Sequence, residues 1–195
     1  PPETLVITTE QYFIVLLLRR KRAFHMATTR RLTCFDLLKF NNVNLDELTE
    51  TYHQPFYLEY LAKWPEYFAV QEAPDKEIMG YVMGKVEGKG KDWHGHVTAV
   101  TVAPEYRRLG LAGKMMDFLE SVSEQIYDAY FVDLYVRASN EVAIGMYTKL
   151  GYNLYRQVIG YYSGEEDAHD MRKSLARDPG KQLEKPHKPL RVPPG

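Results

Sequence analysis

The sequence predicts one α/β domain whose central sheet mixes parallel and antiparallel strands. Two observations lead to this fold class. Three consecutive strand-like runs are separated only by short turn sequences, and after them helical and strand-like periodicities alternate twice. The chain of 195 residues is long enough for one well-buried domain. Its apolar fraction of 45% and charged fraction of 26% are ordinary for a globular protein.

Two helices are expected before the strands. Residues 33–36 (TCFD) fit the Ser/Thr-x-x-acid pattern of a helix start, and the apolar stripe of this helix consists of Phe35, Leu37 and Leu38. Residues 41–42 (NN) end it. Pro55 suits the first turn of a second helix, which mixes aromatic and apolar residues up to Trp64.

The three strand-like runs are Tyr67–Glu72, Ile78–Glu87 and Trp93–Val102. Turn residues at 74–75 (PD) and 88–90 (GKG) separate them, which predicts an antiparallel meander.

The second half alternates helix and strand. After Arg108, apolar residues recur at three- and four-residue spacing, which predicts a helix with a buried face of Ala112, Met115, Met116, Leu119, Val122 and Ile126. A buried strand follows at Ala129–Val136. Ser139 or Asn140 caps a further helix that Gly151 ends, and Tyr152–Tyr162 forms the last predicted strand.

The composition and the two ends of the chain limit the possible functions. A formal net charge of −1 argues against a general nucleic-acid binder. Cys34 is the only cysteine, so no internal disulfide is expected and an intracellular setting is the default. Residues 1–26 are predicted to be a disordered, non-native or alternative-start extension, with a membrane-surface anchor as the alternative. The proline-rich residues 176–195 are predicted to be a disordered tail.

The junction between the third strand and the next helix carries two arginines and a glycine. At such a junction, backbone N–H groups are unpaired and the helix dipole favours anions. Gly110 has no Cβ and lets a phosphate approach the backbone, and Ala112 keeps the next turn small. Arg107 and Arg108 add positive charge. This segment therefore predicts a diphosphate cradle; a solvated basic helix start is the alternative.

Two motifs make the chain resemble the GNAT superfamily of N-acetyltransferases. Val102-x-Pro104 precedes the Arg-x-x-Gly-x-Ala loop, and after one strand comes Asn140-x-x-Ala143-x-x-x-Tyr147. The chain further resembles catalytic subunits of NatB-type N-terminal acetyltransferases in FNNVNLDELTETY, PFYLEYLAKWPEYF, GYVMGK, WHGHVTAVTVAPEYRRLGLA, FVDLYVR and DMRKSLARD. The resemblance covers about residues 28–178. It implies a GNAT fold, with a mixed central sheet flanked by helices, in a domain at 27–175.

The resemblance implies transfer of an acetyl group from acetyl-CoA to the α-amine of chains beginning Met-Asp, Met-Glu, Met-Asn or Met-Gln. Backbone groups at Val100 and Val102 then pair with the pantetheine, and Asn140 contributes to the coenzyme site. Tyr147 takes the family position near the coenzyme sulfur and is the candidate acid. Without the resemblance, Tyr147 reads as a core tyrosine on an apolar helix face.

A second set of residues is expected to hold the peptide. The resemblance places Glu50 and Tyr52 in the loop at the peptide entrance, and Tyr161 and Tyr162 over the peptide backbone, where a proton can be relayed through water. Gly160 stands where an acidic residue is expected.

Strand alternation places His96, Thr98, Val100 and Val102 on one face. His96 and Thr98 are therefore predicted to contact the second side chain of the substrate, and His94 is predicted to lie at the surface. Two histidines without a third ligand nearby predict no metal site.

Two other functions keep the coenzyme motifs: acetylation of a lysine or a small amine, and a non-catalytic scaffold that binds the coenzyme. If the resemblance holds, a large helical-repeat auxiliary subunit binds the segment 33–63 and links the protein to the ribosome. We then expect a cytoplasmic protein without direct contact to nucleic acid or membrane.

Overall fold

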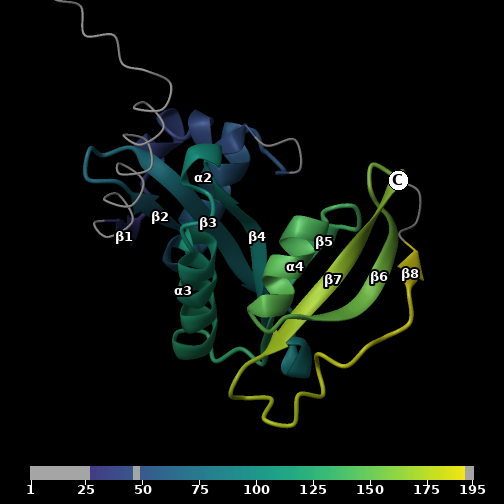
Figure 1. The fold of residues 1–195 in the computed structure, drawn as a ribbon. Helices are drawn as coiled ribbons and strands as arrows, with labels where there is room; N and C mark the ends of the chain where they lie inside the picture. The colour runs from purple at the N-terminus through teal and green to yellow at the C-terminus, as the bar shows by residue number, and fades with distance from the viewer. Residues whose placement is uncertain (1–26, 46–48, 192–195) are drawn as a thin grey trace, which may run out of the picture.

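The computed structural model describes residues 27–45 and 49–191, and these form a mixed sheet with helices packed against it (Figure 1). Within these residues the sheet has eight strands in the order β1-β2-β3-β4-β5-β7-β6-β8. Figure 1 shows two halves that spread apart: β1 to β4 with α2 and α3 on one side, and β6 and β7 on the other. The bounds of the strands are Thr28–Arg31 (β1), Ala69–Glu72 (β2), Ile78–Glu87 (β3), His94–Val102 (β4), Phe131–Arg137 (β5), Asn153–Tyr162 (β6), Glu166–Ser174 (β7) and Leu190–Arg191 (β8).

The helices lie close to their predicted positions. They are α2 (Gln54–Lys63), α3 (Leu111–Gln125) and α4 (Glu141–Lys149). The predicted meander is confirmed, because β2, β3 and β4 pair antiparallel in sequence order. The second predicted helix has Pro55 in its first turn, as expected.

The first predicted helix is wrong in type and in its buried face. Residues 33–44 form two short 3₁₀ helices, η1 (Cys34–Leu38) and η2 (Asn41–Asn44), instead of one α-helix. The capping box at Thr33 and Asp36 is present. However, Leu37 is buried while Phe35 and Leu38 are 71% and 70% exposed. A 3₁₀ turn places its side chains every third residue, so the stripe expected from a 3.6-residue period does not form.

Helix α3 packs closely on the sheet and forms the centre of the core. Met115, Met116 and Leu119 are fully buried, whereas Ile126, predicted to be buried, is 56% exposed at the end of the helix. Gly95 on β4 permits this close packing, because a Cβ there would lie 2.0 Å from the Ser123 hydroxyl oxygen of α3. The same hydroxyl lies 3.0 Å from the Tyr67 hydroxyl, so the buried polar atoms are paired.

Strands β4 and β5 separate partway along their length. They pair in parallel only from His94 opposite Phe131 to Val97 opposite Leu134. Beyond Val97, β4 continues beside β3 while β5 continues beside β7. Among the described residues, the backbone groups of β4 that point toward β5 therefore have no strand partner after residue 97.

Three strands were missed in the sequence. Strand β1 pairs with β2, and β7 lies between β5 and β6. The β7 sequence EDAHDMRKS shows no apolar alternation, because its inward positions include charged side chains such as Asp170 and Arg172 that are buried as pairs.

The tail predicted to be disordered from residue 176 is instead bound to the domain as far as residue 191. Asp178 accepts hydrogen bonds from the Ser174 hydroxyl and the Leu183 N–H, and Glu184 accepts one from the Ser174 N–H. Strand β8 then pairs in parallel with β6. Polar and backbone hydrogen bonds hold this segment against the domain. The sequence did not predict them, because the segment has few apolar residues.

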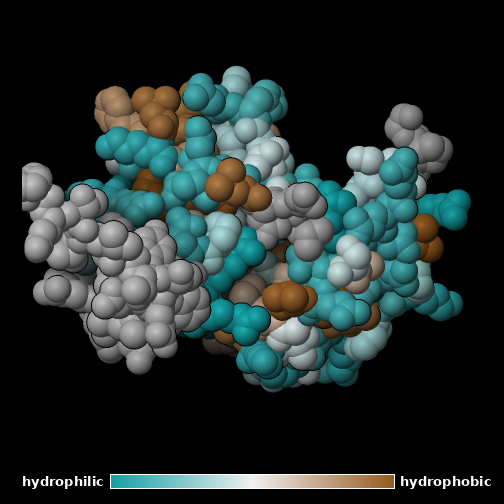
Figure 2. All heavy atoms as spheres, turned by 45° about the horizontal axis from the view of Figure 1, so that its top comes forward, coloured by the Kyte–Doolittle hydropathy of each residue, from teal (hydrophilic) through white to brown (hydrophobic). Residues whose placement is uncertain are grey.

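The extension predicted at residues 1–26 and the last residues 192–195 lie outside the described residues. Within the described parts of the chain, no helix is long and apolar enough to cross a membrane. The face drawn in Figure 2 is mainly hydrophilic, with apolar side chains exposed in a few separate places.

Candidate active site

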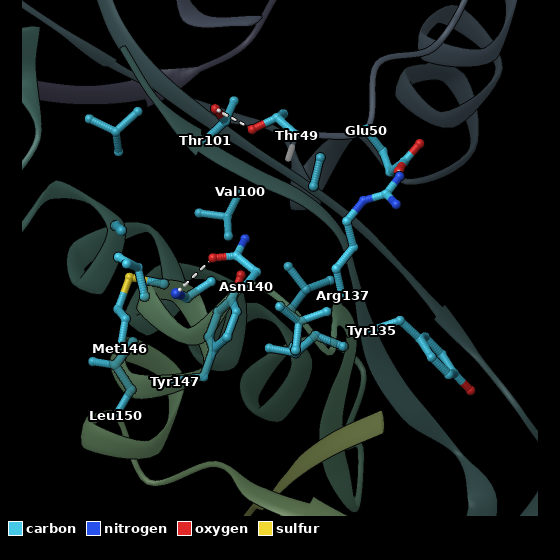
Figure 3. Close-up of a pocket in the computed structure, with 18 of the residues that line it drawn as sticks. Thr49, Glu50, Val100, Thr101, Tyr135, Arg137, Asn140, Met146, Tyr147 and Leu150 are labelled. Atoms are coloured by element: carbon cyan, nitrogen blue, oxygen red, sulfur yellow. Dashed lines mark hydrogen bonds and ion pairs between the residues drawn. The ribbon is translucent and has the colours of Figure 1, made fainter. Parts of the chain in front are cut away.

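One cavity follows the opening between β4 and β5 and has a volume of about 810 Å³. It collects side chains from the loop at 49–52, from β4, from the start of α3, from α4 and from the end of β6 (Figure 3). All of the predicted site residues line it: Glu50, Tyr52, His96, Thr98, Val100, Val102, Arg107, Arg108, Gly110, Ala112, Asn140, Tyr147, Tyr161 and Tyr162. Their individual roles remain predictions.

The segment 108–113 presents bare backbone N–H groups at the start of α3. Gly110 is the residue before the helix, and its φ of 74° lies in the left-handed region that favours glycine. The first N–H bonded in the helix is that of Lys114, to the Gly110 carbonyl oxygen at 3.2 Å. Among the described residues, the N–H groups of 108–113 have no hydrogen-bond partner. They form an anion site of the kind found at helix N-termini, and this agrees with the predicted diphosphate cradle.

The cradle is open to a ligand. An added Cβ at Gly110 would meet no atom within 4 Å. Arg107 donates from Nε to the Val102 carbonyl oxygen at 3.2 Å, which ties the cradle to the end of β4. Arg108 has a φ of 66°, an uncommon conformation for a residue with a side chain. Strain of this kind collects at ligand sites.

Asn140 and Tyr147 bring α4 to the opposite wall of the cavity. The Asn140 side chain caps α4 by accepting from the Ala143 N–H at 3.1 Å. About two turns further along, the Tyr147 ring points into the cavity beside Asn140 (Figure 3). The ring packs edge-on against Tyr152 at 6.0 Å between centroids.

Burial raises the pKa of the Tyr147 hydroxyl well above its usual range. The hydroxyl is therefore protonated at neutral pH and can donate a hydrogen bond. A thiol has a pKa near 8.5, so complete proton transfer from this tyrosine to a thiolate is uphill. Stabilisation of a leaving sulfur by hydrogen bonding is the role that this environment favours.

A β-bulge in β4 overturns the predicted strand face. Val97 pairs with Gly84 and Ala99 pairs with Met83, so Thr98 is the extra residue. The bulge reverses the alternation after it. Val100 and Val102 consequently face α3, on the side opposite to His96, and the expectation that all four residues share one face is wrong. The Thr98 hydroxyl is buried at the cavity wall and has no partner among the described residues.

The two histidines of β4 occupy different environments, and only His94 departs from its predicted position. His96 lines the cavity, and its Nδ1 lies 2.8 Å from Oδ1 of Asp133. His94 is only 7% exposed, so its predicted surface position is wrong. It packs flat on Phe131 with ring centroids 4.6 Å apart.

The end of β6 supplies an aromatic wall. Tyr161 stacks on Tyr135 at 4.7 Å, and the Tyr162 hydroxyl donates to the Tyr135 carbonyl oxygen at 3.3 Å. Gly160 is explained by its backbone: its φ is 69°, and its N–H donates to Asp167 at 2.8 Å. An acidic residue at this position would be strained.

Arg137 is a site residue that the sequence analysis missed. Its guanidinium pairs with Glu50 and, at 2.7 Å, with Glu166, and it lies 4.1 Å from the Tyr162 ring centroid. Hydrogen bonds to these carboxylates raise its pKa further. Figure 3 shows Arg137 extending toward Glu50, and its pair with Glu166 joins the loop at residue 50 to β7. Its position as the last residue of β5, in FVDLYVR, was the available signal.

Tyr52 completes this side of the cavity. It stacks on Phe56 at 4.2 Å, and burial raises the pKa of Tyr52 to about 12. Among the described residues, no group of three or more His, Cys, Asp or Glu side chains is placed to hold a metal ion.

Residues 36–152 match the model of the acetyltransferase (GNAT) family, which is more than half of the chain. The chain therefore belongs to this family, and the predicted GNAT fold is confirmed.

The more specific similarities are to one branch of the family. The N-terminal acetyltransferase B complex catalytic subunit NAA20 of Arabidopsis thaliana is 64% identical over 153 residues, which cover 78% of this chain and 88% of that relative. The structure of Chaetomium thermophilum Naa20 in complex with a bisubstrate analogue matches with a TM-score of 0.80 and 41% identity, over 84% of this chain and 96% of that one. The NatB acetyltransferase complex bound to CoA and MES matches with a TM-score of 0.70 and 43% identity, over 76% and 99%.

Proposed function

We propose that the chain is the catalytic subunit of a NatB-type N-terminal acetyltransferase. It transfers the acetyl group of acetyl-CoA to the α-amine of chains beginning Met-Asp, Met-Glu, Met-Asn or Met-Gln. The 64% identity to a NatB catalytic subunit and the likeness to a NatB complex that binds CoA support this proposal. Catalytic N-terminal acetylation is the activity for which these relatives are named.

The observation that carries the proposal is the row of bare N–H groups at 108–113, in the same cavity as the open edge of β4. The N–H groups at 108–113 suit a diphosphate. The open edge of β4 offers hydrogen bonds to the amides of a pantetheine arm. Arg107, Arg108 and Asn140 line this half of the cavity, and Val100 and Val102 form its strand edge.

The reaction needs little assistance with the amine. An α-amino group has a pKa of about 7.7–8.0, so a useful fraction is neutral at physiological pH. Tyr147 then stabilises the leaving sulfur, and Tyr161 and Tyr162 close over the peptide and relay the amine proton through water. Glu50 and Tyr52 form the entrance for the peptide. The ion pair between Glu50 and Arg137 holds the Glu50 side chain in place.

We further propose that an auxiliary subunit of helical repeats covers the segment 33–63 and holds the protein at the ribosome, in the cytoplasm. This segment exposes apolar side chains that a monomer has little reason to leave in water, namely Phe35, Leu38, Leu45 and Leu58. Changing Phe35 and Leu38 together to aspartate is expected to abolish recovery of the large subunit in a pull-down while coenzyme affinity is unchanged. Recovery of the variant in the complex would contradict this contact.

A thiol-release assay across matched peptides tests the activity. Peptides beginning Met-Asp are expected to release CoA, whereas those beginning Met-Leu, Ser-Glu or Ala-Glu release at least tenfold less. Each peptide carries one internal lysine, and mass spectrometry locates the acetyl group. Acetylation of the lysine alone would replace the proposal by a lysine acetyltransferase. Coenzyme binding without release from any peptide, with the partner present, would replace it by a scaffold.

A further inference from the structure

A buried carboxylate lies between the two histidines of β4. Asp133 on β5 is 3% exposed. Its Oδ1 is 2.8 Å from Nδ1 of His96, and its Oδ2 is 3.4 Å from Nε2 of His94. Asp133 does not line the cavity, so it contacts His96 from the protein interior.

Within the described residues, the direct ionic contacts of the Asp133 carboxylate are to these two histidines. Arg172, which lies opposite Asp133 in the register of β5 and β7, donates to both oxygens of Asp170 at 3.2 and 3.3 Å and packs on the rings of Phe131 and Tyr155. A buried carboxylate without a paired charge is strongly disfavoured. Burial raises the pKa of Asp133, but the charge and hydrogen bond of His96, together with the charges of His94 and Arg172, hold this pKa below its usual range.

Only one of the two rings offers a free nitrogen to the cavity. His94 uses Nε2 toward Asp133, and its Nδ1 lies 2.5 Å from the Asp92 carbonyl oxygen. His96 uses Nδ1 toward Asp133, so Nε2 is the nitrogen left for a ligand. The His96 ring lies 5.8 Å from the ring of Tyr135, which stacks on Tyr161. The His96 ring therefore lies on the aromatic, peptide side of the cavity.

Other charged groups surround this cluster from each packed element. Lys85 and Glu87 on β3 pair at 2.7 Å, and Glu87 lies 3.9 Å from His94. Asp170 and Arg172 come from β7, and Arg156 on β6 pairs with Asp170 at 3.0 Å. The titratable hydroxyls of Tyr135 and Tyr161 complete the surroundings. Within the described residues, Asp133 is the carboxylate in hydrogen-bond contact with His96.

We propose that Asp133 is the positioning residue that holds the Nδ1–H of His96 and thereby supports a second proton on Nε2, which donates to the acidic second side chain of the substrate. This inference rests on the proposed function and deepens it. In the complex the ring lies between two carboxylates, and that arrangement favours the doubly protonated form. A Met-Asn substrate brings no second charge, so it gains less from Asp133 than Met-Asp does.

The test compares Asp133→Asn with the unchanged enzyme complex on two peptides that differ only in Asp or Asn at the second position. The variant is expected to raise KM for the Met-Asp peptide about tenfold. For Met-Asn, KM changes less than threefold, and kcat for both peptides stays within threefold. Coenzyme affinity, measured in parallel, is unchanged and reports that the fold is intact.

A second variant provides an independent readout. His96→Asn removes the donor that Asp133 holds, so the preference for Met-Asp over Met-Asn in kcat/KM is expected to fall in this variant as it does in Asp133→Asn. This comparison decides the matter even if Asp133→Asn does not fold.

An unchanged Met-Asp to Met-Asn ratio in a folded Asp133→Asn variant would overturn the inference, and so would an unchanged ratio in His96→Asn. Either result leaves the proposed function intact, because transfer to Met-Asp peptides still occurs. Absence of transfer to any Met-Asp or Met-Asn peptide would instead refute the proposed function.

Discussion

The coenzyme half and the peptide half of the cavity are built in different ways. The coenzyme half consists of backbone groups from one short segment, 108–113, and of the unpaired edge of β4. The peptide half consists of side chains from distant parts of the chain, joined in pairs such as Glu50 with Arg137 and His96 with Asp133.

This difference separates a fixed site from an adjustable one. Backbone N–H groups recognise a diphosphate that is the same for every substrate, and their position depends on the fold alone. Side-chain pairs can be exchanged one at a time, so they suit the part of the site that distinguishes one N-terminus from another. Each half should therefore respond to different substitutions.

The largest effect is expected from a charge placed in the cradle. Gly110→Asp puts a carboxylate beside the bare N–H groups, where it competes with the diphosphate and adopts a strained positive φ. Coenzyme affinity measured by calorimetry is expected to fall about 100-fold, the equivalent of one or two lost charge-assisted hydrogen bonds.

Gly90→Asp is the matched control for this change. Gly90 also has a positive φ, 60°, and an added Cβ there would meet open space. However, Gly90 lies in the connection between β3 and β4 and does not line the cavity. It carries the same backbone strain and the same added charge. Equal coenzyme affinity in the two variants would show that the cradle has no special role.

A change at the boundary between the halves should affect the rate alone. Tyr147→Phe removes the buried hydroxyl that stabilises the leaving sulfur, so kcat is expected to fall about 100-fold. Coenzyme affinity should stay within threefold because the ring remains. Tyr152→Phe, which alters the neighbouring ring outside the cavity lining, is the control. If both variants lose the same activity, packing rather than the hydroxyl is responsible.

A change within the peptide half should act on the peptide alone. Arg137→Met releases Glu50, Glu166 and the Tyr162 ring, and steady-state kinetics is expected to show a peptide KM about tenfold higher. Arg177→Met is a close match, because Arg177 also pairs with a carboxylate and packs on a tyrosine ring, at Tyr130. A raised KM for acetyl-CoA in Arg137→Met would show that the halves are not separate.

The smallest effect on activity is expected at Asp36, which anchors η1 to β1. Arg30 lowers the pKa of Asp36 to about 2. Its contribution to stability is therefore present above the unfolded pKa of about 3.9 and is lost as the pH falls through about 2. Asp36→Asn should lower the free energy of unfolding at pH 7 by about 2 kcal/mol and flatten the acid limb of the stability curve.

Chemical denaturation from pH 7 to pH 2 measures this loss. Asp117→Asn, on the exposed surface of α3, is the control for the same exchange. Coenzyme affinity and peptide KM of Asp36→Asn should match those of the unchanged protein. A denaturation profile identical to that of the control would contradict the role of the Arg30 pair.

The two halves also differ in how far the sequence predicts them. The cradle is local, since an alternating strand, a Pro, two arginines and a glycine lie within about a dozen residues, and its geometry followed from them. The bulge at Thr98 was not predictable, because it depends on the register against β3. Arg137 was missed for a similar reason: its partners at 50 and 166 are far away in the sequence.

The remaining differences between the sequence predictions and the structure concern which residues are buried. Strand β7 and the residues after 176 are held by paired polar groups, which composition alone does not distinguish from a solvated segment. The converse holds at Phe35 and Leu38, where apolar residues that suggested a buried stripe are exposed.

A crystal structure of the protein with its auxiliary subunit, acetyl-CoA and a Met-Asp peptide tests the division of the cavity most directly. The diphosphate is expected within 3.2 Å of N–H groups in 108–113, and the peptide N-terminus between Tyr147 and Tyr161. A diphosphate bound elsewhere, with those N–H groups bonded to protein atoms, would contradict the account.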